Sequence, residues 1–140
     1  MAKEFNKVHV FVEDLAEKVH DLGSDQLKVA LTNTDPTSAL ENYAGITSPI
    51  AATNLDGATP FNVTTTSSSQ TAGTYKLVVE DLTLTATGEV GPFRYVVLYN
   101  DTAAADQVIG YYDYESSITL HSGDTFKIDW SQEDGVLTLV

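Results

Sequence analysis

The segment Phe93–Trp130 constrains the fold more than any other part of this chain, because it contains four strand-like runs separated by short turns. In Thr125–Trp130 apolar side chains alternate with polar ones, and Ser117–His121 repeats the pattern. Alternation with a period of two places one face of a strand in a core and the other in water. The segment therefore predicts a two-faced antiparallel sheet, with any function on the surface of that sheet or in its loops.

Further strand-like runs occur before and after this segment, with turn residues at regular intervals between them. They are Gln26–Thr32, Tyr75–Glu80, Leu82–Thr85 and Val136–Val140. About eight short strands at this spacing are typical of an all-β sandwich or barrel. Because a long early excursion precedes a compact late meander, we expect an antiparallel, jelly-roll-like β-sandwich. At 140 residues, the chain is long enough to form one domain, residues 1–140, with its own core.

Residues 1–15 fit two patterns. Their apolar side chains recur at helical spacing, whereas the alternating Val8, Val10 and Val12 fit one face of a strand. We expect a short N-terminal arm or helix here, followed by a strand near Val19–Leu22.

Residues 46–74 form a low-charge excursion rich in Thr and Ser, in which Asp56 is the single charged residue. Such a composition is typical of a long surface loop. The alternative is a weak edge strand that includes Phe61 and the threonines after it, because threonine favours β structure. An exposed, nearly uncharged edge is also what a strand from a partner can extend.

Charge excludes one class of partner. Twenty acidic residues against seven basic ones give a formal charge of −13, and the scattered basic residues form no patch. Nucleic-acid binding requires Lys and Arg side chains that displace counterions from phosphates, so we expect no nucleic-acid partner. The first residues show neither a signal peptide nor a membrane span, so we expect synthesis in the cytoplasm and no membrane association. The chain contains no cysteine, which excludes disulfides.

No catalytic motif is present in the sequence. His9, His20 and His121 lie in differently patterned segments and match no metal-binding spacing. Acidic residues in turns, such as Asp101 and Asp106, offer oxygen ligands suited to calcium, although isolated acids in turns more often cap the backbone. We expect no catalytic residue, no metal site and no cofactor, and hence a protein that is not an enzyme.

The aromatic residues indicate binding rather than catalysis. In the run Tyr111–Tyr114, Tyr111 points to the face opposite to that of Tyr112 and Tyr114, so one face presents tyrosine outward or to a second layer. Exposed tyrosine is typical of protein interfaces and of sugar-binding platforms. Alternation directs Trp130 inward, which weighs against a sugar platform built on it.

Three runs of the sequence resemble a family of small virion proteins of tailed bacteriophages. They are Leu22–Thr34, Gly91–Thr102 and Ile109–Tyr114. Members of that family are similar to head decoration, or cement, proteins. The resemblance implies a jelly-roll sandwich on the outer capsid surface of the virion, with no catalytic residues. It also implies the major capsid protein as partner, with neighbouring copies of the chain forming a homo-oligomer on the capsid.

A decoration protein gains affinity from several weak contacts, because bridging two subunits makes the second contact intramolecular. We predict that the contacts include seven apolar or aromatic side chains. They are Phe5, Val8, Phe11, Phe61, Tyr111, Tyr112 and Tyr114. The alternative functions are a tail structural component and a carbohydrate-binding or receptor-contact module, the latter using Tyr112, Tyr114 and Trp130 for stacking.

Overall fold

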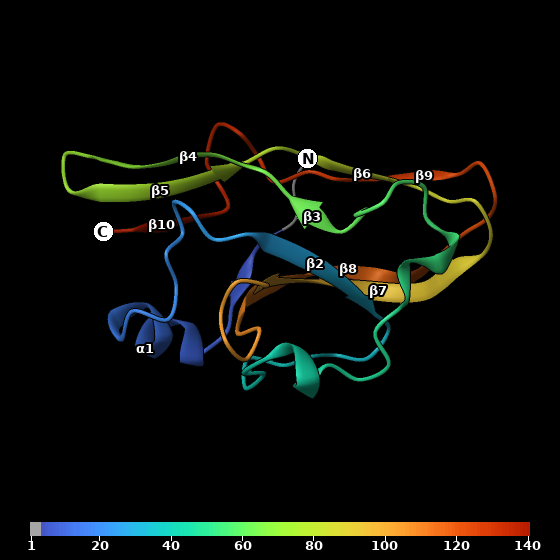
Figure 1. The fold of residues 1–140 in the computed structure, drawn as a ribbon, viewed down its shortest axis with the longest axis horizontal. Helices are drawn as coiled ribbons and strands as arrows, with labels where there is room; N and C mark the ends of the chain where they lie inside the picture. Colours follow the sequence, from blue (N-terminus) through green and yellow to red (C-terminus); the bar gives the residue numbers. More distant parts are fainter. Residues whose placement is uncertain (1–3) are drawn as a thin grey trace.

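The computed structural model describes residues 4–140, and within that range the strands form three antiparallel sheets (Figure 1). The largest is a five-stranded sheet with the order β1-β8-β7-β2-β3. Its strands are β1 (Asn6–Lys7), β2 (Leu27–Thr32), β3 (Asn62–Val63), β7 (Val90–Asn100) and β8 (Val108–Leu120).

The other two sheets form a second layer over the five-stranded sheet (Figure 1). One has the order β10-β5-β4 and the other pairs β6 with β9. Their strands are β4 (Thr65–Thr71), β5 (Thr74–Val79), β6 (Leu82–Thr85), β9 (Thr125–Ile128) and β10 (Leu137–Leu139). The all-β antiparallel sandwich expected from the sequence is confirmed, and the jelly-roll topology stays a prediction.

Strand β2 shows how the core is arranged around the five-stranded sheet. Leu27, Val29 and Leu31 are fully buried, as their alternation predicts. Ala30 and Thr32 on the opposite face are buried too. The long connection 33–61 covers that face, and the Thr32 hydroxyl donates a hydrogen bond of 2.6 Å to the carbonyl of Thr47. The sheet is therefore covered on both sides.

The N-terminal segment contains both a strand and a helix. After β1, the chain forms helix α1 (Val10–Ala16), while the first three residues of the predicted arm lie outside the described range. The strand expected near Val19–Leu22 is not formed. Val19–Asp21 has no regular structure and a turn follows at residues 22–24, where the backbone amide of Asp21 donates to the Asp25 carboxylate at 2.9 Å. Local side-chain bonds of this kind compete with a strand ladder.

Strand β8 joins two runs that the sequence pattern separates. The sequence pattern predicts two strands here, Val108–Tyr112 and Ser117–His121, but β8 continues from Val108 to Leu120. The break in the pattern is a bulge: Tyr95 pairs with Asp113, whereas Phe93 pairs with Ile118. Glu115 within the bulge has a φ of 68°, which lets the strand resume its pairing beyond the extra residues.

The low-charge excursion contains regular structure at its end. Of the two interpretations of residues 46–74, the edge strand holds for Asn62–Val63, which is β3, and for Thr65–Thr71, which is β4. A two-residue turn at Ala72 and Gly73 joins β4 to β5, with φ angles of 51° and 87°. Positive φ at both positions is the geometry of the hairpin turn whose twist matches that of its strands.

Candidate functional site

Three of the seven predicted interface residues are part of the core. Val8 and Phe11 have no exposed surface, and Tyr112 is 2% exposed. A partner cannot reach these side chains while the fold is intact, so we remove them from the predicted interface. Their apolar character reflects burial of the N-terminal segment against the sheet rather than a free arm.

Tyr112 is the centre of an aromatic cluster between the layers. Its ring lies 5.4 Å from Phe5, 5.2 Å from Trp130 and 6.2 Å from Tyr114. Tyr114 in turn lies 5.2 Å from Phe126. Burial raises the pKa of Tyr114 to about 12. Phe5 and Tyr114, both half-buried, are thus occupied by contacts within the chain.

Gly110 makes it possible for the N-terminal segment to pack closely against β8. A Cβ atom at this position would lie 2.5 Å from the carbonyl oxygen of Asn6 and 2.6 Å from the ring of Phe5. Asn6 pairs with Tyr111 and Lys7 with Gly110, so β1 crosses the glycine directly. Only a residue without a side chain accommodates this approach.

The two remaining predicted residues, Tyr111 and Phe61, lie apart from this cluster. Tyr111 is half-buried and packs at 6.3 Å against Tyr95, on the face opposite to Tyr112, as the alternation predicts. Phe61 is half-buried just before β3, and its carbonyl accepts a hydrogen bond from the Val29 amide at 3.0 Å. Tyr111 and Phe61 therefore do not form a shared surface.

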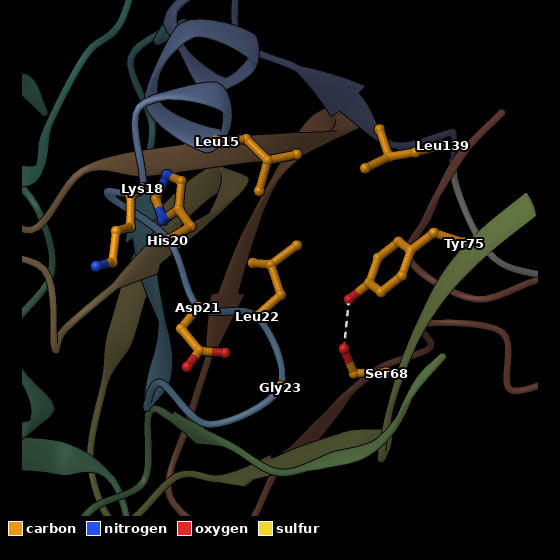
Figure 2. Close-up of a pocket in the computed structure, with 9 residues that line it drawn as sticks. All are labelled: Leu15, Lys18, His20, Asp21, Leu22, Gly23, Ser68, Tyr75 and Leu139. Atoms are coloured by element: carbon orange, nitrogen blue, oxygen red, sulfur yellow. Dashed lines mark hydrogen bonds between the residues drawn. The ribbon is translucent and has the colours of Figure 1, made fainter. Parts of the chain in front are cut away.

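A groove lies where the β10–β5–β4 sheet extends beyond the five-stranded sheet, opposite α1 (Figures 1 and 2). We call it the α1 groove. Its volume is about 590 Å³. Leu15 and Leu22 line one side, and Tyr75 and Leu139 face them from the other (Figure 2). The structure thus brings together apolar side chains from four separate parts of the chain.

A few polar groups complete the α1 groove. The hydroxyls of Ser68 and Tyr75 share a hydrogen bond of 2.7 Å (Figure 2), and burial raises the pKa of Tyr75. Lys18 and Asp21 also contribute to the lining. An apolar concavity with a small number of polar groups is the usual composition of a site that accepts an apolar side chain or ligand.

A buried polar network fixes the turn behind the groove. The Asn100 amide donates to His20 Nδ1 at 3.0 Å and to the Asp25 carboxylate at 2.7 Å. The Asn100 oxygen accepts from the amide of Thr102 at 2.9 Å, which fixes the orientation of the side chain. His20 Nδ1 is therefore an acceptor, as in a neutral imidazole. Burial lowers the pKa of His20, although the nearby Asp14 carboxylate acts in the opposite direction.

Beside the groove, strand β4 forms an open edge of the second layer. Among the residues described, it pairs with β5 and with no other strand. Thr66–Thr71 are exposed, and the strand consists entirely of Thr, Ser and Gln. Ser68 belongs both to this edge and to the lining of the α1 groove.

No cluster of three His, Asp or Glu side chains suited to a metal ion occurs in the range 4–140. His9, His20 and His121 are not brought together in any such cluster there. Over the same residues, no helix is long and apolar enough to cross a membrane.

Comparison of the chain with models of known protein families, with curated proteins and with solved structures gave no match. Sequence reasoning missed the groove residues Leu15, Leu22 and Leu139, because each looks like an ordinary core position and they meet only through folding. The sequence did contain a signal for the β4 edge, because that strand has no charged residue.

Proposed function

We propose that this protein is a head decoration protein of a tailed bacteriophage, which binds the outer surface of the major capsid protein lattice and stabilises the head by bridging subunits. The observation that carries the proposal is the position of the family-like runs in the fold. Leu22–Thr34 contains β2, Gly91–Thr102 covers most of β7, and Ile109–Tyr114 lies in β8. These strands are neighbours in the five-stranded sheet, so the resemblance covers one contiguous framework.

The distribution of side chains supports a binding rather than a catalytic role. Most of the aromatic residues pack in or against the core, while polar, uncharged side chains form an open edge at β4. A rigid acidic domain with local contact surfaces suits attachment to a lattice, where several weak contacts act together. A sugar-binding module is less favoured, because Trp130 and Tyr112 are 1% and 2% exposed and cannot stack on a sugar.

Binding to heads tests the proposal directly. Purified protein is mixed with mature heads assembled without it, the heads are sedimented, and bound protein is quantified against added protein. We expect saturable binding at a fixed ratio to the major capsid protein, together with immunogold label on the heads of intact virions. Label confined to tails, or no binding to heads at saturating protein, would overturn the proposal. A neighbouring gene for the major capsid protein would support it further.

A further inference from the structure

We propose that β4 is a docking edge for an extended segment of the capsid partner, which adds a strand to the β10–β5–β4 sheet and places a large apolar side chain in the α1 groove. The inference rests on the proposed function and names the contact through which the partner is held. Strand addition combines main-chain hydrogen bonds, which give affinity, with a side-chain pocket, which gives specificity.

The backbone of β4 has hydrogen-bonding groups available for such a strand. Thr71 and Thr74 flank the two-residue turn, and Ser69 pairs with Lys76 two positions further along. In an antiparallel hairpin these alternate pairs exchange the hydrogen bonds. Ser68 and Gln70, which lie between them, therefore direct their N–H and C=O groups away from β5. Outside the strand ladders, no described segment makes a backbone hydrogen bond to Ser68 or Gln70.

The charge distribution indicates the chemistry of the incoming strand. Residues 57–75 contain no charged side chain, in a chain whose formal charge is −13. Exposed edges in monomeric proteins commonly carry charges that prevent pairing, and β4 has none. A strand can therefore pair here without desolvating a charge. Because a second copy of the chain brings an equal negative charge, electrostatics favours a different protein, with a segment free of acidic residues.

Continuity between edge and groove supports an apolar anchor on that segment. Ser68 lines the α1 groove and hydrogen-bonds Tyr75, so its side chain lies on the inner face of the sheet. An added strand lies about 4.8 Å from β4, and its inward-facing residue beside Ser68 is directed to the same side as Leu22. The volume of about 590 Å³ is ample for one large aliphatic or aromatic side chain.

The backbone part of the proposal is tested with Gln70→Pro. Proline removes the outward N–H and obstructs pairing at the edge, while the ladder with β5 needs no donor from this residue. The matched control is Thr138→Pro, in β10 at the opposite edge of the same sheet. In the head-binding assay we expect Gln70→Pro to bind about tenfold more weakly and Thr138→Pro to bind like wild type.

The outcomes of this assay separate the inference from the proposed function. Equal binding by Gln70→Pro and wild type, or equal loss in both proline variants, would overturn docking at β4 while head binding by the wild type stands. Failure of the wild type itself to bind would instead overturn the proposed function. Circular dichroism and thermal unfolding of each variant show whether the fold is kept.

Crosslinking covers the case in which Gln70→Pro does not fold. Because the chain has no cysteine, Gln70→Cys provides a unique thiol for a benzophenone label, and Thr138→Cys provides the control. After irradiation on heads, we expect position 70 to crosslink to an extended segment of the capsid protein more strongly than position 138. No crosslink from position 70, or a crosslink only to a second copy of this chain, would contradict the proposal.

The groove part is tested by a pair of charge substitutions. Leu139→Asp places a carboxylate in the α1 groove, whereas Thr138→Asp places the same charge one residue away on an exposed position. We expect Leu139→Asp to weaken head binding about tenfold or more and Thr138→Asp to leave it unchanged. Wild-type binding by both variants would overturn the apolar anchor.

Discussion

The five-stranded sheet and the β10–β5–β4 sheet differ in how they use their two faces. In the first, β2 and β7 are buried on both sides, and every residue from Tyr95 to Asn100 is inaccessible to solvent or nearly so. In the second, β4 is exposed from Thr66 to Thr71, and the inner face ends in a groove rather than in packed side chains. The five-stranded sheet is therefore enclosed on both faces, whereas the other sheet adds β5 to the core and leaves β4 as exposed surface.

The largest expected effect tests whether the packed core stabilises the domain more than the exposed β4 edge does. Trp130 is 1% exposed and packs against Tyr112 between the layers. We expect Trp130→Ala to lower the free energy of unfolding by about 3–5 kcal/mol, because it leaves a cavity in the core. Ser69→Ala in β4 should change it by less than about 0.5 kcal/mol. Urea unfolding measures both, and a comparable loss in the two variants would break the contrast.

A smaller effect is expected where the N-terminal segment joins the five-stranded sheet. Gly110→Ala directs a methyl group into the carbonyl of Asn6 and the ring of Phe5. We expect a loss of about 1–3 kcal/mol from overpacking, with faster proteolysis of β1 and α1. Gly23→Ala is the control, because its added Cβ meets its nearest neighbour at an ordinary 3.5 Å. Equal protease resistance in both variants would show that β1 is not held by this approach.

The pH dependence of the free energy of unfolding tests the role of His20, which lies between the two regions. Its pKa is lowered from the ordinary value of 6.5 chiefly by burial. The unfolded chain therefore takes up a proton at a higher pH than the folded chain. Protonation favours unfolding, and it also converts His20 Nδ1 from an acceptor into a donor facing the Asn100 amide.

Stability should thus be fully present above about pH 6.5 and fall as the pH drops towards the lowered pKa of the folded state. The slope for one proton is at most about 1.4 kcal/mol per pH unit. The neighbouring Asp14 has a raised pKa, chiefly through burial. Its contribution to stability therefore changes with pH in the opposite direction: it is present at low pH and is lost as the pH rises above the ordinary Asp pKa of 3.8. Urea unfolding of wild type and His20→Gln between pH 5.5 and 8 should give curves that diverge below pH 6.5, and parallel curves would contradict this role.

The smallest expected effect concerns the hairpin turn of the second layer. Ala72 has a φ of 51°, which alanine adopts at a cost and asparagine tolerates better. Ala72→Asn should raise the free energy of unfolding by about 0.5 kcal/mol. The exposed Ala104 does not have a positive φ, so Ala104→Asn should give no gain. A gain of the same size in both would indicate a general surface effect instead.

The sequence predicted strands that have one apolar and one polar face. It predicted less where local hydrogen bonds, or contacts between residues far apart in the chain, determine the structure. Alternation located β2 and β9 and directed Trp130 inward. It failed near Val19–Leu22, where the Asp21 and Asp25 side chains stabilise a turn. It also divided β8 in two, because a bulge interrupts the period without ending the strand.

The predicted interface shows a different limit. Val8 and Phe11 fit an exposed arm as well as a buried one, because the pattern of a short segment does not say what covers it. The α1 groove could not be predicted at all, since Leu15, Tyr75 and Leu139 are far apart in the chain. The β4 edge was partly predictable, because an uncharged run of β-favouring residues is unusual in so acidic a chain.

The shortest connection between the five-stranded sheet and the β10–β5–β4 sheet is a single residue, Thr64, between β3 and β4. A pull on β4 passes through that residue to β3, which pairs with β2 at only two positions in the described chain. The Gln26 side chain adds one crosslink there, donating to the Val63 carbonyl at 3.0 Å. We expect this short junction to separate under tension before the long β7–β8 pairing does, because it has fewer paired positions. The domain would then extend at one place under load while the rest of its framework stays folded.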